Sequence, residues 1–133
     1  MEQQNTILVV DDEVTCITFL VHLLQDEFTV LVAKDGQDAI NMAVKHLPDL
    51  ILLDVDMPNM TGYEVLAQLK TFKESETIPA IFITSRDKPS DEEDGLRLGA
   101  VDYINKSCGM EIIRMRIRNQ LYLINKLKMQ HPV

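Results

Sequence analysis

Five short runs of apolar residues recur along the chain, and each is followed by a polar or turn-forming segment. The runs are rich in β-branched and aliphatic side chains and lie at residues 7–10, 28–33, 50–53, 79–83 and 101–104. The runs at 7–10, 50–53 and 79–83 are continuously apolar, which is typical of strands buried on both faces of a parallel sheet, whereas 28–33 and 101–104 each include a polar residue, Thr29 and Asp102. The pattern therefore predicts five strands.

Between these runs, apolar residues recur at helical spacing. A first helix is predicted by Val14, Ile17, Leu20, Val21 and Leu24, and a second, ending at Pro48, by Ala39, Ile40, Ala43, Val44 and Leu47.

Two Ser/Thr-x-x-Glu segments predict the starts of two further helices. Thr61 and Glu64 form one capping box, ahead of a helix that turns Val65, Leu66 and Leu69 inward. A second box, Ser90 to Glu93, is expected to open a short fourth helix that closes near Gly99.

The last helix is predicted from about Cys108 to Lys128. One stripe of this helix carries its apolar residues, Ile113, Ile117, Leu121 and Ile124, and continues to Leu127.

Strand and helix alternate throughout, which predicts an α/β fold with a parallel sheet. Right-handed crossovers put helices on both faces of such a doubly wound sheet and bring the carboxyl ends of the strands to one edge. The residues that follow the strands, and that we expect at this edge, are Asp11, Asp12, Asp54, Asp56, Thr84, Ser85 and Lys106.

The length and net charge of the chain limit the classes of protein to which it can belong. A chain of 133 residues with 46% hydrophobic residues suits one domain and is too short for two well-packed cores. The formal net charge of −8 argues against nucleic acid or an anionic membrane as the main partner. Cys16 and Cys108 have no metal-ligand spacing, and we find no targeting or membrane-spanning segment, so a cytoplasmic location is expected.

Clustered carboxylates at the predicted edge indicate a hard divalent cation. Two carboxylates about 4 Å apart repel by about 4 kcal/mol at an effective dielectric constant near 20, and Mg²⁺ relieves this repulsion with oxygen ligands. A cation, the Lys106 ammonium and the Thr84 hydroxyl are together suited to stabilise a phosphoryl group in transfer, and Asp54 is the candidate nucleophile.

Each residue also has a simpler interpretation. Asp11 and Asp12 could cap the first helix, Thr84 could be an ordinary strand-end residue, and Lys106 could be a solvated surface lysine. Because all of them follow strands in the order that brings them to one edge, we favour the functional interpretation.

The same residues resemble the receiver domain of two-component response regulators. The resemblance covers about residues 5–125 and is carried by Asp11-Asp12-Glu13, by Leu53 to Pro58 with Gly62, by Thr84-Ser85, and by Gly99 to Lys106. It implies a flavodoxin-like three-layer sandwich with five helices and the strand order 2-1-3-4-5. The expected domain is a single receiver spanning residues 1–133, in which 120–133 extend the last helix.

The resemblance also implies roles for individual residues. Asp54 would accept a phosphoryl group from a sensor histidine kinase, a phosphotransfer protein or a small donor, with self-catalysed transfer and slow autodephosphorylation as the only enzymatic activity. Mg²⁺ or Mn²⁺ would be bound by Asp12 directly, by Asp11 through water, by Asp54 and by the backbone carbonyl of Asp56. Thr84 would contact the phosphoryl group, Lys106 would pair with it, and Tyr103 would be the switch aromatic that remodels the surface of the fourth helix, fifth strand and fifth helix.

Two features depart from the family pattern or extend it. Ser107 follows Lys106 where the family usually has a proline, commonly after a cis peptide, and a cis bond without proline costs about 3 kcal/mol. The long last helix resembles linkers to an output domain, often a cyclic-di-GMP enzyme. A truncated protein, a single-domain regulator and a homodimer through this helix remain as alternatives.

Two other functions compete with this interpretation. Asp54-Val55-Asp56 resembles the nucleophile motif of haloacid dehalogenase-type phosphatases, but those enzymes carry it on their first strand and place an acidic pair late in the chain. A pseudo-receiver would keep the fold without phosphorylation. The complete set of acidic residues, threonine and lysine argues against it.

Overall fold

The computed structural model describes residues 4–130 of the chain. Its strands are β1 (Thr6–Val10), β2 (Thr29–Ala33), β3 (Leu50–Leu53), β4 (Ala80–Thr84) and β5 (Asp102–Asn105). Its helices are α1 (Val14–Leu24), α2 (Gly36–His46), α3 (Gly62–Leu69), α4 (Pro89–Arg97), a 3₁₀ turn η1 (Lys106–Cys108) and α5 (Met110–Gln130).

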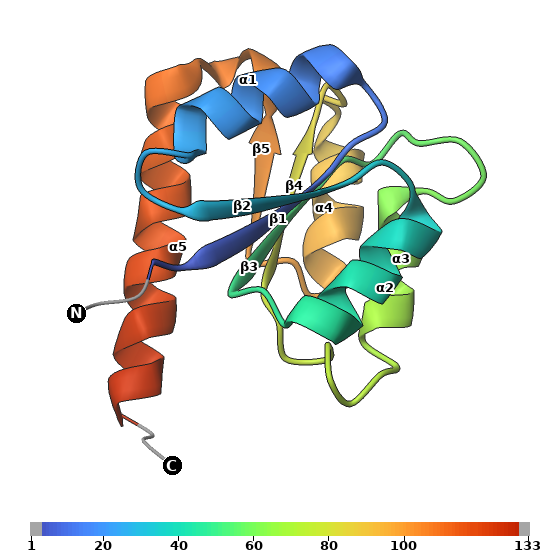
Figure 1. Cartoon of the computed structure of the whole chain (residues 1–133). Helices are drawn as coiled ribbons and strands as arrows, with labels where there is room; N and C mark the ends of the chain where they lie inside the picture. Colours follow the sequence, from blue (N-terminus) through green and yellow to red (C-terminus); the bar gives the residue numbers. More distant parts are fainter. Residues whose placement is uncertain (1–3, 131–133) are drawn as a thin grey trace.

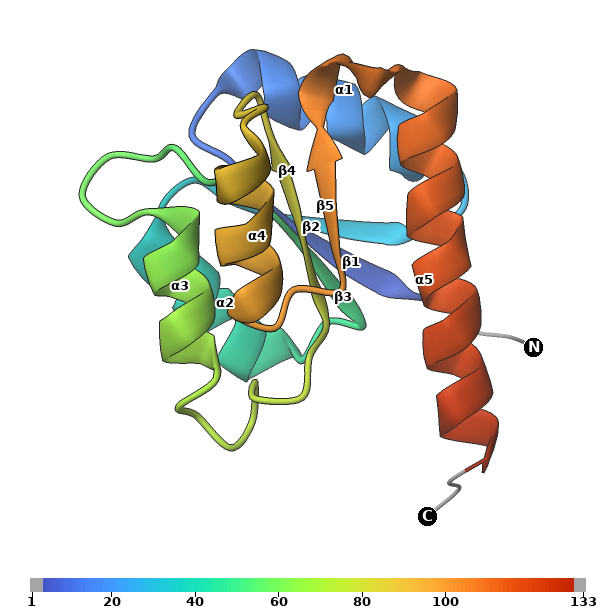
Figure 2. The ribbon, with the colours of Figure 1, turned by 180° about the vertical axis from the view of Figure 1, so that it is seen from behind.

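All five strands pair in parallel in the order β2-β1-β3-β4-β5, as expected. Helices α1 and α5 cover one face of the sheet, and α2, α3 and α4 cover the other (Figure 1, Figure 2). The predicted doubly wound α/β fold, a three-layer sandwich, is confirmed.

Successive residues of a strand point to opposite faces of the sheet, so each strand contributes side chains to the hydrophobic core on either face. Ile7 and Val9 of β1 pack with α1 and α5, whereas Leu8 and Val10 pack with the core beneath α2 and α3. This alternation explains why β1, β3 and β4 are almost continuously apolar, because both of their faces are buried. The edge strand β2 is partly exposed.

The ends of the helices follow local chemistry. Thr61 and Glu64 form the predicted capping box at the start of α3. The second predicted box is wrong: α4 begins after Lys88, with no side-chain cap. Pro89 suits the first helical position, so the helix has already begun at Ser90, which therefore lies inside the first turn and not at the cap.

The last helix begins and ends about two residues later than predicted, at Met110 and Gln130. The 3₁₀ turn ends at Cys108, and Gly109, with a positive φ of 93°, separates it from α5. Ile113, Ile117 and Leu121 form the buried stripe, but Leu127 is 58% exposed because α5 continues past the sheet (Figure 2).

Three other predictions, each about a residue at the end of a helix or strand, need correction. Val14, placed on the buried side of α1, is 64% exposed, and Leu47 lies outside α2, with a positive φ of 49° and 57% exposure. The fifth strand begins at Asp102, one residue later than predicted. Within residues 4–130, no helix has the length and apolar character needed to cross a membrane.

Candidate functional site

The candidate site lies where parallel strands end at one edge of the sheet. The ladder between β1 and β3 extends one residue past β3, because the Asp54 N–H donates to the carbonyl of Val10 at 2.9 Å. This bond holds Asp54 beside the residues that follow β1. Thr84 closes β4, and Lys106 follows β5.

Three carboxylates meet at this edge. Asp11, Asp12 and Asp54 each offer an oxygen atom, and these atoms lie within 4.8 Å of one another. Asp11 and Asp54 are only 1% and 4% exposed, whereas Asp12 is exposed to solvent. The donor set is oxygen only, and it keeps one solvent-facing member, which fits a hydrated Mg²⁺ or Mn²⁺ ion.

Lys106, which follows the edge strand β5, also reaches this cluster. Its Nζ donates to Asp11 Oδ2 at 2.9 Å and lies 3.6 Å from Asp54 Oδ1. Burial lowers the pKa of the Lys106 ammonium, but the hydrogen bond to Asp11 and the charges of Asp54 and Asp11 outweigh burial and raise it above its usual range. The lysine side chain therefore stays charged. The peptide bond between Lys106 and Ser107 is trans.

The Asp54 carboxyl is unusually weak as an acid. Burial, and then the negative charge of Asp11, raise its pKa to about 7, against the opposing effect of Lys106. A buried carboxylate beside another is costly to ionise without a cation. The electrostatics of the cluster thus favour a positively charged ligand.

Gly62 lets the loop after β3 fold back over the site. A Cβ at this position would lie 2.2 Å from the carbonyl oxygen of Asp54, and the Gly62 N–H donates to the carbonyl of Val55 at 2.8 Å. Only glycine permits this approach, which fixes the backbone that carries Asp54 and Asp56.

Thr84 and Tyr103 occupy neighbouring strands, as the sequence suggested. Thr84 is fully buried, and its Oγ1 accepts a hydrogen bond from the Arg86 N–H at 3.3 Å. Tyr103 points inward with 6% exposure and packs against Phe82, with ring centroids 6.1 Å apart. Its buried hydroxyl has no hydrogen-bond partner within the described residues.

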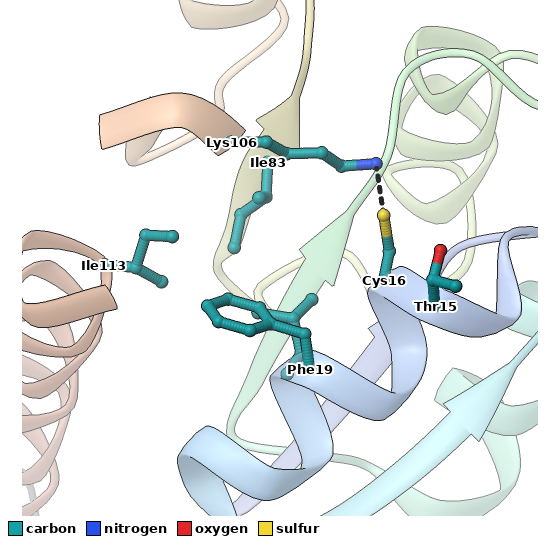
Figure 3. A pocket seen from close by; sticks show the side chains of 7 residues that line it. Thr15, Cys16, Phe19, Ile83, Lys106 and Ile113 are labelled. Carbon is teal, nitrogen blue, oxygen red and sulfur yellow. Dashed lines mark hydrogen bonds between the residues drawn. The ribbon is translucent and has the colours of Figure 1, made fainter. Parts of the chain in front are cut away.

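Two contacts at the site were not predicted. The Arg86 guanidinium binds the Asp56 carboxylate with Nε and Nη2, at 2.9 Å and 2.7 Å. Lys106 Nζ also donates to Cys16 Sγ at 3.3 Å, across the rim of an apolar cavity of about 250 Å³ between α1 and α5 (Figure 3). Neither pair has a sequence signal, because its members are 30 and 90 residues apart.

Comparison with known proteins agrees with this geometry. The response regulator receiver domain model matches residues 7–118. The "Probable cyclic di-GMP phosphodiesterase" of Vibrio cholerae serotype O1 is 39% identical over 89% of this chain and 27% of its own length. The "Transcriptional regulatory protein CreB" of Escherichia coli K12 is 33% identical over 98% of this chain and 57% of its own length. The chain thus spans less than two thirds of either relative.

The fold has close structural counterparts as well. The chemotaxis response regulator CheY4 of Vibrio cholerae superimposes with a TM-score of 0.82 at 28% identity, covering 88% of this chain and 98% of that one. Because the family model spans most of the chain and both the sheet order and the acidic edge agree with it, the chain belongs to the response regulator receiver domain family.

Proposed function

We propose that Asp54 is the phosphoacceptor of this receiver domain. The observation that carries the proposal is the arrangement at the sheet edge: a buried carboxylate beside two others, with the Lys106 ammonium 3.6 Å away. One carboxylate serves as nucleophile in this arrangement. The other two carboxylates can bind a cation, and the Lys106 ammonium offsets negative charge.

The transfer is a displacement at phosphorus. An Asp54 carboxylate oxygen forms a bond to phosphorus as the bond to the donor, a histidine nitrogen or a small-molecule oxygen, breaks. Lys106 pairs with a phosphoryl oxygen, and Thr84 turns its hydroxyl toward the same group. These contacts gain strength as charge spreads over the phosphoryl oxygens, so they lower the barrier.

Mg²⁺ or Mn²⁺ fits the donor set described above. Asp12 would hold it directly, Asp11 through water, and Asp54 and the carbonyl of Asp56 would supply further oxygens. When bound, the cation adds positive charge that keeps Asp54 ionised at neutral pH and offsets the charge of the phosphoryl group. Without it, a carboxyl with a pKa of about 7 is only partly ionised at that pH.

The donor we infer is a phosphohistidine on a sensor kinase or phosphotransfer protein. Receiver domains interact with such proteins, and the "Histidine kinase P4" of Formosa agariphila is 35% identical to this chain over 9% of its own length. We also propose that residues 1–133 act as one cytoplasmic receiver, with its core at 5–125. Phosphorylation switches the α4-β5-α5 surface that this receiver presents to partners, and the domain does not turn over a substrate. In this proposal the end of α5 leads to an output domain or pairs with a second copy.

The experiment is phosphorylation by acetyl phosphate in the presence of Mg²⁺, followed by intact-mass measurement. We expect one added phosphoryl group, lost in Asp54→Ala and lost when the cation is chelated. Asp56→Ala is the matched control, because it keeps the backbone carbonyl and should still be modified. A phosphoryl group that persists in Asp54→Ala would place the acceptor elsewhere.

A further inference from the structure

The Lys106 ammonium is held by groups from three parts of the fold. Its Nζ donates to Asp11 Oδ2 at 2.9 Å and to Cys16 Sγ at 3.3 Å, and it lies 3.6 Å from Asp54 Oδ1. Asp11 follows β1, Cys16 lies in the first turn of α1, and Asp54 follows β3. Two of these three contacts are made with carboxylates of the acidic cluster, and the third is made with a thiol.

The backbone at Lys106 is fixed by a local cap. Asn105 Oδ1 accepts hydrogen bonds from the Ser107 N–H at 2.8 Å and from the Ser107 hydroxyl at 2.6 Å, at the start of η1. The lysine side chain, in contrast, is a flexible four-carbon stem, so its conformation depends on contacts along the stem and at the ammonium. The direction in which the ammonium points is therefore set by its side-chain contacts.

The Lys106 stem runs along the cavity between α1 and α5. Apolar side chains of Phe19, Ile83 and Ile113 line this cavity, and they offer no hydrogen-bond acceptor to an ammonium (Figure 3). The Lys106 side chain is only 20% exposed, so an N–H turned toward the cavity without an acceptor would be costly. The Cys16 sulfur supplies an acceptor at the rim of the cavity, on the side of the acidic cluster.

Cys16 differs from the two carboxylates in its charge. A thiol is uncharged at neutral pH, and burial raises the pKa of Cys16 further, against the opposing hydrogen bond from Lys106. The carboxylates of Asp11 and Asp54 are proposed ligands of a divalent cation, so their charge is shared with that cation once it is bound. The Cys16 sulfur is outside the proposed ligand set, and its contact with Lys106 is therefore independent of the cation.

We propose that Cys16 is a positioning residue for Lys106, whose sulfur holds the ammonium at the rim of the cavity beside Asp54, where Lys106 can pair with a phosphoryl oxygen during transfer. Cys16 takes no part in the bond changes and acts through Lys106 alone. This inference rests on the proposed function of Asp54, and it adds to that function a residue contributed by α1.

The first test is the rate of phosphorylation by acetyl phosphate with Mg²⁺, followed by intact mass on the full chain. Cys16→Val removes the acceptor and should slow phosphorylation about fivefold, the effect of one hydrogen bond lost in the transition state. Cys16→Ser restores an acceptor and should recover a rate within about twofold of the wild type. In the slower Lys106→Met background, Cys16→Val should change the rate by less than about twofold, because no ammonium remains to be positioned.

The second test needs neither the cation nor a phosphoryl donor. Thermal unfolding in chelator is compared for the wild type, Cys16→Val, Lys106→Met and the double variant. Cys16→Val should lower Tm by about 3 °C more in the wild-type background than in the Lys106→Met background, because only the former has a hydrogen bond between Cys16 and Lys106 to lose. An equal change in the two backgrounds would overturn the contact.

Thr15→Val is the matched control, because Thr15 precedes Cys16 on α1 and lines the same cavity, and within the described residues it makes no hydrogen bond to Lys106. Its phosphorylation rate should equal that of the wild type. If Cys16→Val does not fold, Cys16→Ala also lacks the acceptor and carries the same expectations.

The outcomes separate the two hypotheses. A wild-type rate in Cys16→Val, or an equal slowing in the Lys106→Met background, would overturn the positioning role and leave the role of Asp54 standing. Absence of a phosphoryl mass on the wild type would refute the role of Asp54 and with it the catalytic part of this inference, and the unfolding measurements would then decide the contact between Cys16 and Lys106 alone.

Discussion

Replacing Asp54 by asparagine should stabilise the protein in the absence of divalent cations, and only above mildly acidic pH. The Asp54 pKa of about 7 lies above the ordinary aspartate value of 3.8, so folding disfavours the ionised form. Well below pH 3.8 the carboxyl is protonated in both the folded and the unfolded state, and folding carries no electrostatic penalty. As pH rises toward 7, the unfolded chain ionises first and stability is lost.

The size of this gain in stability follows from how far burial raises the Asp54 pKa. An increase in the Asp54 pKa from 3.8 to about 7 corresponds to at most about 4 kcal/mol at pH 8, and linkage reduces this to less than about 1 kcal/mol at pH 4. Asp54→Asn cannot ionise and avoids the penalty. For a domain of this size the gain corresponds to an increase in Tm of about 10–15 °C at pH 8 and to almost none at pH 4.

Thermal unfolding with a chelator at pH 4, 6 and 8 measures the difference between variant and wild type, so that acid effects common to both cancel. Asp56→Asn is the control: its side chain is 52% exposed and paired with Arg86, and its loss should cost no more than about 1 kcal/mol. Asp54→Asn with a Tm at pH 8 equal to or below that of the wild type would refute the electrostatic reasoning.

Three further substitutions test the packing around the site. Gly62→Ala should lower the free energy of unfolding by about 3 kcal/mol in urea titration, because its Cβ would strike the Asp54 carbonyl; an unchanged midpoint would mean that the loop can move. Tyr103→Phe should raise the free energy of unfolding by about 1 kcal/mol by removing a buried hydroxyl that has no partner among the described residues, whereas a loss would show that the hydroxyl is bonded. Lys106→Met should cost about 2 kcal/mol at pH 8 in chelator because buried Asp11 loses its counter-ion, and Mg²⁺ should recover part of this loss; equal stability with and without the lysine would contradict the pairing.

The sequence alone determined the sheet and the composition of its edge. Short continuous apolar runs bounded by turn formers are typical of strands covered on both faces, and their alternation with helices predicts that they are parallel. Because parallel strands end at the same edge of a sheet, the sequence alone predicted that Asp54 and Lys106 lie at that edge. The Thr61 capping box was equally readable, since both partners lie within one turn.

Two of the packing predictions failed because they assumed that a helix is covered evenly along its length. Periodicity places Val14 and Leu127 on apolar stripes, but it carries no information on where the sheet beneath a helix stops. The Ser90 box failed because a proline one residue earlier starts the helix first.

Only the tertiary structure decided which charges pair at the site. Arg86 with Asp56, and Lys106 with Asp11, join residues 30 and 95 positions apart, and the choice depends on loop paths and side-chain reach that no local pattern encodes. The same packing buries Asp11 and leaves Asp12 in solvent, although the two are adjacent in sequence. Residue types and strand order place the candidate catalytic side chains at one edge of the sheet. Packing then sets which of them are charged and paired, because desolvation and ion pairing act only between groups that the fold has brought together.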